Sequence, residues 1–100
     1  VFDYRGFGAS DGTPRQDPVP ESQIADYRNA ISWARACADI DPRRIGIWGT
    51  SYSGAHVLVV AARDRRVRAV VSQVPLIDGR GTMELLAGVD GCAQMTEQLI

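Results

Sequence analysis

The sequence predicts an α/β fold in which parallel strands are connected by crossover helices. Short apolar segments at 44–49 and 67–74 have the composition of strands that are buried on both faces. Segments of helical periodicity at 22–39 and 55–62 precede and follow the first of these strands, at lengths that permit parallel pairing. One hundred residues supply at most one hydrophobic core. We therefore expect one α/β unit.

Residues 1–20 predict a short strand followed by a long loop. Residues 1–4 are β-prone, and the next sixteen are rich in Gly, Pro, Asp and Ser, which favour turns. Ser22 can cap the helix that follows, whose apolar residues recur every three or four positions. We expect this helix to end near Asp39, before the turn at Asp41-Pro42.

The second half of the chain continues the alternation of strands and helices. The helical segment 55–62 is apolar on nearly all sides, His56 excepted, so other elements must cover it. A solvated connection leads to the strand 67–74. The last predicted elements are helices at 82–87 and 92–100, with breaks at Gly88 and Gly91.

Composition and charge argue against several kinds of partner. Apolar residues make up 45% of the chain and charged residues 23%, which is ordinary for a globular protein. The longest apolar run, 57–62, is too short to span a bilayer. The net charge is −1 without a basic stripe, which argues against nucleic acid and anionic lipid. Cys37 and Cys92 lack metal-ligand spacing, and we expect both to be thiols in a reducing, cytoplasmic compartment.

The segment 49–54, Gly-Thr-Ser-Tyr-Ser-Gly, has the pattern of a nucleophile elbow between a strand and a helix. Such an elbow turns so tightly that the nucleophile is strained and its side chain projects from the turn. The residues two positions before and after must be small, and Gly49 and Ser53 flank Ser51 in this way. The standard pattern has glycine where this chain has Ser53. A serine-rich turn without a catalytic role is the alternative interpretation.

The residues around Ser51 suit acyl chemistry. The backbone N–H of Tyr52 can donate toward an oxyanion, and the helix N-terminus adds partial positive charge. His56, the only histidine, lies five residues after Ser51. A helix turns about 140° beyond a whole turn over that distance, so His56 points away from Ser51. We expect it to be a hydrogen-bonded histidine of a packed helix.

The chain resembles the α/β-hydrolase superfamily, and within it the branch of bacterial serine esterases, dienelactone hydrolase-like enzymes and Xaa-Pro peptidase-like proteins. The segment 3–12, DYRGFGASDG, looks like that family's D-x-R-G-x-G-x-S-x-G loop. The segment 41–54, DPRRIGIWGTSYSG, resembles its strand and elbow. Two such motifs in this order, with a helix between them, are more specific than either alone. The resemblance covers residues 1–79.

The resemblance implies that Ser51 is a catalytic nucleophile and that Tyr52 supplies one oxyanion N–H. Relatives carry the acid and the histidine after later strands. Residues 1–100 are therefore expected to be the central portion of a domain and to be inactive alone, without the N-terminal strands and the C-terminal strands that carry the acid and the histidine. Asp78 follows the strand 67–74, where some relatives place the acid, but we favour a loop aspartate without a catalytic role.

The resemblance also implies that another strand lies between residues 1–4 and 44–50, so these two segments should not pair. Without that strand, strand edges and the face of 57–60 are expected to be uncovered. Asp3 and Arg5 lie beside the site and are candidates for substrate binding. We favour for them a role in an ion pair and hydrogen bonds that hold the shape of the loop.

Two functions stay open. The first is a serine hydrolase that acts on ester, thioester or amide carbonyls of a small-molecule acyl substrate through an acyl-enzyme on Ser51. The second is a non-catalytic binding or interaction protein with the same fold. For either we expect no metal, no organic cofactor, no nucleic acid and no membrane partner; the sequence does not indicate an oligomeric state.

Overall fold

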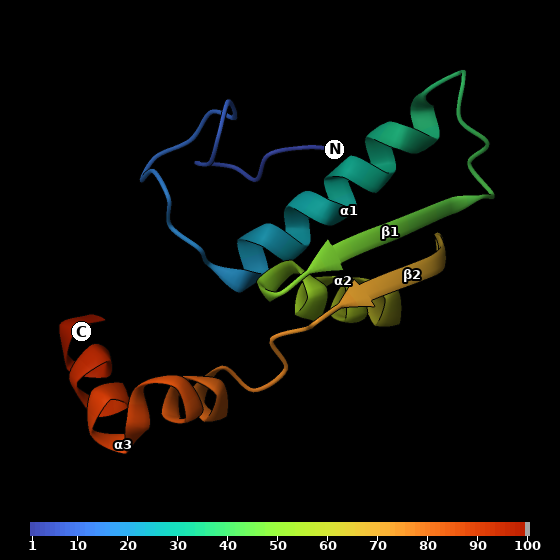
Figure 1. Cartoon of the computed structure of the whole chain (residues 1–100). Coiled ribbons are helices and arrows are strands. Elements are labelled where there is room, and N and C mark those ends of the chain that lie inside the picture. The colour runs from blue at the N-terminus through green and yellow to red at the C-terminus, as the bar shows by residue number, and fades with distance from the viewer. Residues whose placement is uncertain (100) are drawn as a thin grey trace.

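The computed structural model describes residues 1–99, and their side chains except those of residues 89, 92 and 95–99. In chain order the elements are α1 (Pro20–Ala36), β1 (Ile45–Thr50), α2 (Tyr52–Arg63), β2 (Val67–Gln73) and α3 (Gly79–Leu99). Figure 1 shows β1 and β2 side by side as a parallel pair, connected through α2. The predicted α/β class with parallel strands and a crossover helix is confirmed.

The hydrophobic core lies where α1, α2 and β1 meet. It consists of Ile24, Tyr27, Ile31, Ile45, Val57 and Val60. α2 packs against both strands on one side and against α1 on another, as its apolar sequence requires. The expectation that the face of 57–60 is uncovered is wrong, because α1 and the strands leave Val57 and Val60 with 0% of their surface exposed.

Residues 1–4 form no strand, contrary to prediction. A strand needs a hydrogen-bonded neighbour, and a groove of about 580 Å³ lies between this segment and β1. Phe2 and Tyr4 line one side of the groove, and Ile47 and Gly49 of β1 line the other. As expected, the two segments do not pair.

α1 begins at Pro20, two residues before the predicted cap Ser22, and ends at Ala36, before the predicted Asp39. Proline is favoured at the first helical position because it has no N–H to leave unpaired and its fixed φ suits a helix. Ser22 therefore lies inside the helix. Cys37 adopts extended angles, φ −73° and ψ 131°, which end it.

The later helices are longer than predicted. α2 begins at Tyr52, directly after Ser51. α3 spans Gly79–Leu99 but consists of two helical segments that meet at a kink at Gly88, where φ is 76° and ψ 165°, so the predicted break at Gly88 is confirmed. Only glycine adopts such angles readily, so Gly88 is a kink, whereas Gly91 lies within the helix. The final predicted helical residue, Ile100, lies outside the described residues.

Over the part of the chain that the structure describes, no helix is both long and apolar enough to cross a membrane. Cys37 is a free thiol whose Sγ lies 3.4 Å from the Trp33 carbonyl oxygen. The expectation of a thiol holds for Cys37. The side chain of Cys92 lies outside the described residues.

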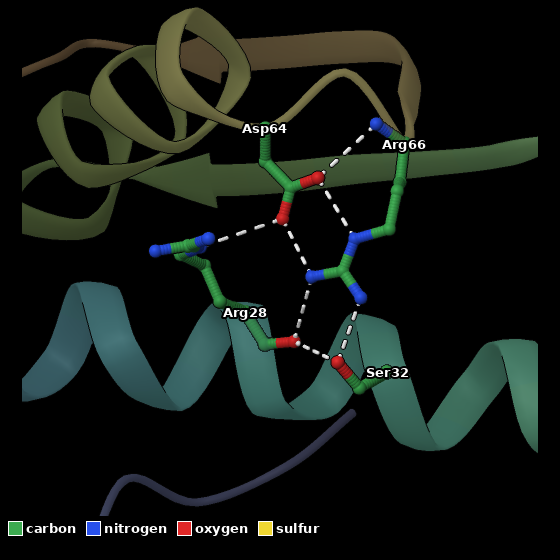
Figure 2. Close-up of polar contacts among 4 residues, drawn as sticks. All are labelled: Arg28, Ser32, Asp64 and Arg66. Carbon is green, nitrogen blue, oxygen red and sulfur yellow. Dashed lines mark hydrogen bonds and ion pairs between the residues drawn. The ribbon is translucent and has the colours of Figure 1, made fainter.

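A network of charged groups ties α1 to the turn between α2 and β2 (Figure 2). The Asp64 side chain is 4% exposed, and its carboxylate accepts hydrogen bonds from Arg66 Nε at 2.8 Å and Nη2 at 2.6 Å. Arg28 of α1 pairs with the same carboxylate at 3.5 Å. Arg66 also donates to Ser32 Oγ of α1 at 2.7 Å. The hydrogen-bonded Arg66 guanidinium holds the pKa of Asp64 well below its ordinary value.

The close approach of β1 and α2 leaves no room for a side chain at Gly49, near the end of β1. A Cβ atom on Gly49 would lie 2.3 Å from the Ser53 carbonyl oxygen and 2.9 Å from Val57 Cγ1. Gly46, on the same strand, differs, because a Cβ atom there would lie 3.5 Å from Ala69, an ordinary contact. Of these two glycines, only Gly49 is required, because strand and helix are close together there.

We expect Asp64→Asn to lower the free energy of unfolding by about 2 kcal/mol at pH 7, because Arg66 and Arg28 lose their carboxylate partner. Asp41 is a matched control, since its carboxylate also accepts from the arginine two residues on, Arg43, but at an exposed site. Asp41→Asn should cost much less. Urea unfolding of protein expressed from its complete coding sequence measures both.

The loss of unfolding free energy in Asp64→Asn depends on pH. The folded-state pKa lies below the unfolded value of about 3.9, so the stabilisation is present above that value and is lost as pH falls toward the folded pKa. The difference in stability between wild type and Asp64→Asn should therefore shrink below about pH 4. Equal costs for the Asp64 and Asp41 variants would contradict the assignment.

We expect Gly49→Ala to lower the free energy of unfolding by about 2–3 kcal/mol, because the added methyl group forces strand and helix apart. Gly46→Ala, the matched control on the same strand, should change it by less than about 0.5 kcal/mol. Thermal unfolding of the two variants beside wild type makes the comparison. A harmless Gly49→Ala would show that the turn is less crowded than the structure has it.

Candidate active site at the turn between β1 and α2

Ser51 is the single residue between β1 and α2, and its backbone is strained. Its φ is 55° and its ψ −115°, a conformation that L-residues rarely adopt. Its N–H donates to the Gln73 carbonyl at 3.0 Å, and its own carbonyl accepts from the Leu76 N–H at 2.9 Å. The end of β2 and the loop after it therefore hold this conformation. The tight bend expected from the sequence is present.

The side chain of Ser51 is exposed and makes no capping hydrogen bond to α2. A serine that served only to start the helix would accept a hydrogen bond from one of the first backbone N–H groups. Within residues 1–99, no hydrogen bond to Ser51 Oγ is found. The hydroxyl is thus free to contact a molecule that binds at the turn.

Tyr52 contributes its backbone and its side chain in different directions. Its N–H lies at the first position of α2, and no carbonyl of the described residues accepts it. The partial positive charge of a helix N-terminus favours negative charge at this place. The Tyr52 phenol donates to the Pro18 carbonyl at 3.1 Å, and its ring packs against His56 with centroids 4.4 Å apart. The side chain therefore ties the turn to the loop before α1.

His56 and Asp78 have partners of their own. His56 is 4% exposed, and its Nε2 lies 2.7 Å from Gln23 Oε1 of α1. Burial lowers the pKa of this imidazole, which belongs to the packed interface between α1 and α2, as expected. The Asp78 carboxylate accepts a hydrogen bond from the Gly81 N–H at 2.9 Å and so caps the start of α3. This contact is of the kind expected for a loop aspartate, and the absence of a catalytic role for Asp78 stays a prediction.

The loop before α1 is held in shape by charged side chains at its start and on α1. The Arg5 guanidinium pairs with Asp26 of α1 at 2.6 Å, and the Arg5 N–H donates to the same carboxylate at 2.8 Å. The Asp3 carboxylate accepts from the Ala9 N–H at 3.0 Å. The shape-holding role favoured for Asp3 and Arg5 agrees with these contacts, although the partner of Arg5 is Asp26 and not Asp3.

Two tyrosines beside the turn were not identified from the sequence. The Tyr4 hydroxyl is hydrogen-bonded to Ser53 Oγ. The Tyr27 hydroxyl donates to the Trp48 carbonyl at 2.9 Å, and burial raises the pKa of this phenol, so it stays a donor. The one signal in the sequence is Ser53 itself, a hydroxyl at a position where the standard pattern has glycine.

Known proteins similar to this chain include hydrolases. It is 54% identical over 79 residues to the quorum-quenching protein AidA of Acinetobacter baumannii, which covers 79% of this chain and 26% of AidA. It is 44% identical over 89 residues to the thiohydrolase aneE of Aspergillus aculeatus, covering 89% of this chain and 28% of aneE. The crystal structure of the α/β hydrolase GrgF from Penicillium superposes with a TM-score of 0.73 at 32% identity, over 96% of this chain and 35% of GrgF.

The chain thus spans between about a quarter and a third of the length of these relatives. The sequence model of the X-Pro dipeptidyl-peptidase (S15) family matches residues 1–91. That match contains both the 3–12 loop and the strand and elbow of 41–54, the segments on which the resemblance rested. The predicted resemblance and fold are confirmed: the chain belongs to the X-Pro dipeptidyl-peptidase (S15) family of α/β hydrolases.

Proposed function

We propose that the protein is a serine hydrolase in which Ser51 attacks the carbonyl carbon of a small-molecule acyl substrate. The observation that carries the proposal is the backbone of Ser51, strained at φ 55° and ψ −115° while its exposed hydroxyl caps nothing. Strain of this kind costs about 1–3 kcal/mol and persists where the structure around it is built to hold it. A plain connection between a strand and a helix needs no such strain.

The reaction divides into acylation and deacylation. A histidine supplied from outside these residues takes the proton from Ser51 Oγ, because His56 is buried against Gln23. Oγ then bonds to the carbonyl carbon, and the carbonyl electrons move to the oxygen, where the Tyr52 N–H donates to the oxyanion. The tetrahedral intermediate then collapses, the bond between the carbonyl carbon and the leaving group breaks, and the histidine gives its proton to the leaving group. Water then attacks the acyl-enzyme, releases the acid and restores the Ser51 hydroxyl.

The substrate class is an ester, a thioester or an amide. A thiohydrolase among the relatives supports a thioester, and the peptidase name of the family supports an amide. All three present a carbonyl carbon to Ser51 and differ in the leaving group. Three substrates with the same acyl group and different leaving groups therefore distinguish the three classes.

A non-catalytic binding protein is the second candidate. Ser53 favours it, because this residue departs from the glycine of the standard elbow. The departure is small, since Ser53 fits the turn and its side chain has a partner in Tyr4. The same experiment decides between the two functions.

We expect Ser51→Ala to abolish labelling by a fluorophosphonate probe and to lower kcat/KM by at least about 10³-fold. The reason is that, among the described residues 1–99, no other residue with a side-chain hydroxyl has a positive φ as Ser51 does. The measurement uses protein from the complete coding sequence with phenyl acetate, S-phenyl thioacetate and acetanilide. The substrate whose kcat/KM is highest relative to its uncatalysed hydrolysis rate identifies the leaving group.

Ser32→Ala is the matched control, because it deletes a hydrogen-bonded serine hydroxyl on α1, in the network around Asp64. This variant should label and turn over as wild type does. Retained labelling in Ser51→Ala would show that another residue is the nucleophile. A wild type that neither labels nor turns over any of the three substrates would favour the binding protein.

A further inference from the structure

Two phenol hydroxyls contact the turn on either side of Ser51. The Tyr27 hydroxyl, from α1, donates to the Trp48 carbonyl, three residues before Ser51. The Tyr4 hydroxyl is hydrogen-bonded to Ser53 Oγ, two residues after it. Both contacts are distant in sequence, separated by 21 and 49 residues. The turn is therefore held by side chains from the beginning of the chain as well as by β2.

The hydrogen bond between Tyr4 and Ser53 explains how the Ser53 hydroxyl is accommodated where β1 and α2 lie close together. A Cβ atom on Gly49 would lie 2.3 Å from the Ser53 carbonyl oxygen, so the first turn of α2 sits directly on the end of β1. Beside this close contact, the side chain of Ser53 is half-buried. Its hydroxyl would lose water there without a partner, at a cost that the Tyr4 hydroxyl offsets.

The ring of Tyr4 is itself fixed in place. Its centroid lies 5.9 Å from that of Tyr27 at an interplanar angle of 63°, and 5.5 Å from that of Phe2 at 87°. His56 of α2 lies on it at 6.4 Å and 76°. Edge-to-face contacts of this kind hold a ring in one orientation. Because its ring is fixed, Tyr4 can hold Ser53 in place through the hydrogen bond of its hydroxyl.

We propose that Tyr4 and Ser53 are positioning residues for Ser51, which rests on the function proposed above. The strain at Ser51 is relieved if the first turn of α2 moves away from β1, and the hydrogen bond between Tyr4 and Ser53 opposes that movement. The Tyr52 N–H lies in the same first turn. The orientation of the Tyr52 N–H toward the oxyanion depends on the hydrogen bond between Tyr4 and Ser53. The orientation of Ser51 Oγ toward the carbonyl carbon depends on the same hydrogen bond. In this role Tyr4 and Ser53 act through the turn and need not contact the substrate.

The proposal is tested by Tyr4→Phe, Ser53→Ala and the double variant in the protein from its complete coding sequence, with the best acetyl substrate. Each single variant should lower kcat about tenfold and leave KM within about twofold, because misplacement affects the transition state more than binding. The double variant should be no slower than the slower single variant, since both remove the same bond. The fluorophosphonate labelling rate should fall in parallel.

A merely structural bond gives a different pattern. The melting temperature would fall, but kcat per folded molecule would stay at the wild-type value, which overturns the proposal. Multiplied losses in the double variant also overturn it, because they would mean that the two hydroxyls act separately. Ser53→Gly, which restores the standard pattern, is the second variant, and it should lose as much in kcat as Ser53→Ala. Ser32→Ala again serves as the matched serine control, with unchanged kcat.

Failure of this inference is distinguishable from failure of the proposed function. If Ser51→Ala is inactive while Tyr4→Phe and Ser53→Ala keep wild-type kcat, the hydrolase assignment stands and the positioning role is wrong. If Ser51→Ala is fully active, the hydrolase assignment through Ser51 fails, and the positioning role fails with it.

Discussion

The arrangement of this chain depends on one strained residue between a strand and a helix. At Ser51 the chain leaves β1 and enters α2 within a single residue, at angles that cost free energy. The strain persists because its peptide groups are hydrogen-bonded to Gln73, at the end of β2, and to Leu76, just after it. β2 therefore contributes more than a partner strand, since its end restrains the bend. A side chain at Gly49 is excluded for the same reason, because strand and helix are so close there.

The packing around α2 keeps this bend in position. Val57 and Val60 are fully buried between α1 and the sheet, so α2 cannot tilt without opening the core. At its far end, Asp64 and Arg66 fasten the exit of α2 to α1. The helix that begins with the candidate oxyanion donor is thus restrained at both ends, by the Tyr4 hydroxyl at its first turn and by an ion-pair network at its last. Restraint of the first turn, where the Tyr52 N–H lies, is what electrostatic stabilisation of an oxyanion requires.

The elements with strong local signals were predictable, and those that depend on distant partners were not. The apolar strands, the periodic helix α1 and the elbow pattern around Ser51 are local, and the structure has them within a few residues. The predicted strand at residues 1–4 fails because pairing is decided by a neighbour, which no local pattern reveals. The start of α1 at Pro20 was missed because the proline was assigned to the preceding loop, although the first helical position favours proline. The contacts of Tyr4 and Tyr27 were out of reach, since both join residues more than twenty positions apart.

The departure at Ser53 shows how a motif and its surroundings share one task. A glycine at this position needs no partner but gives the first turn of α2 no side-chain restraint. A serine brings a hydroxyl that must be hydrogen-bonded when half-buried, and Tyr4 meets that need from outside the motif. The sequence pattern alone is then weaker than the standard one, while the turn gains an attachment that glycine cannot make. Because that attachment comes from residue 4, the fitness of the elbow has to be judged from its tertiary contacts as well as from its six residues.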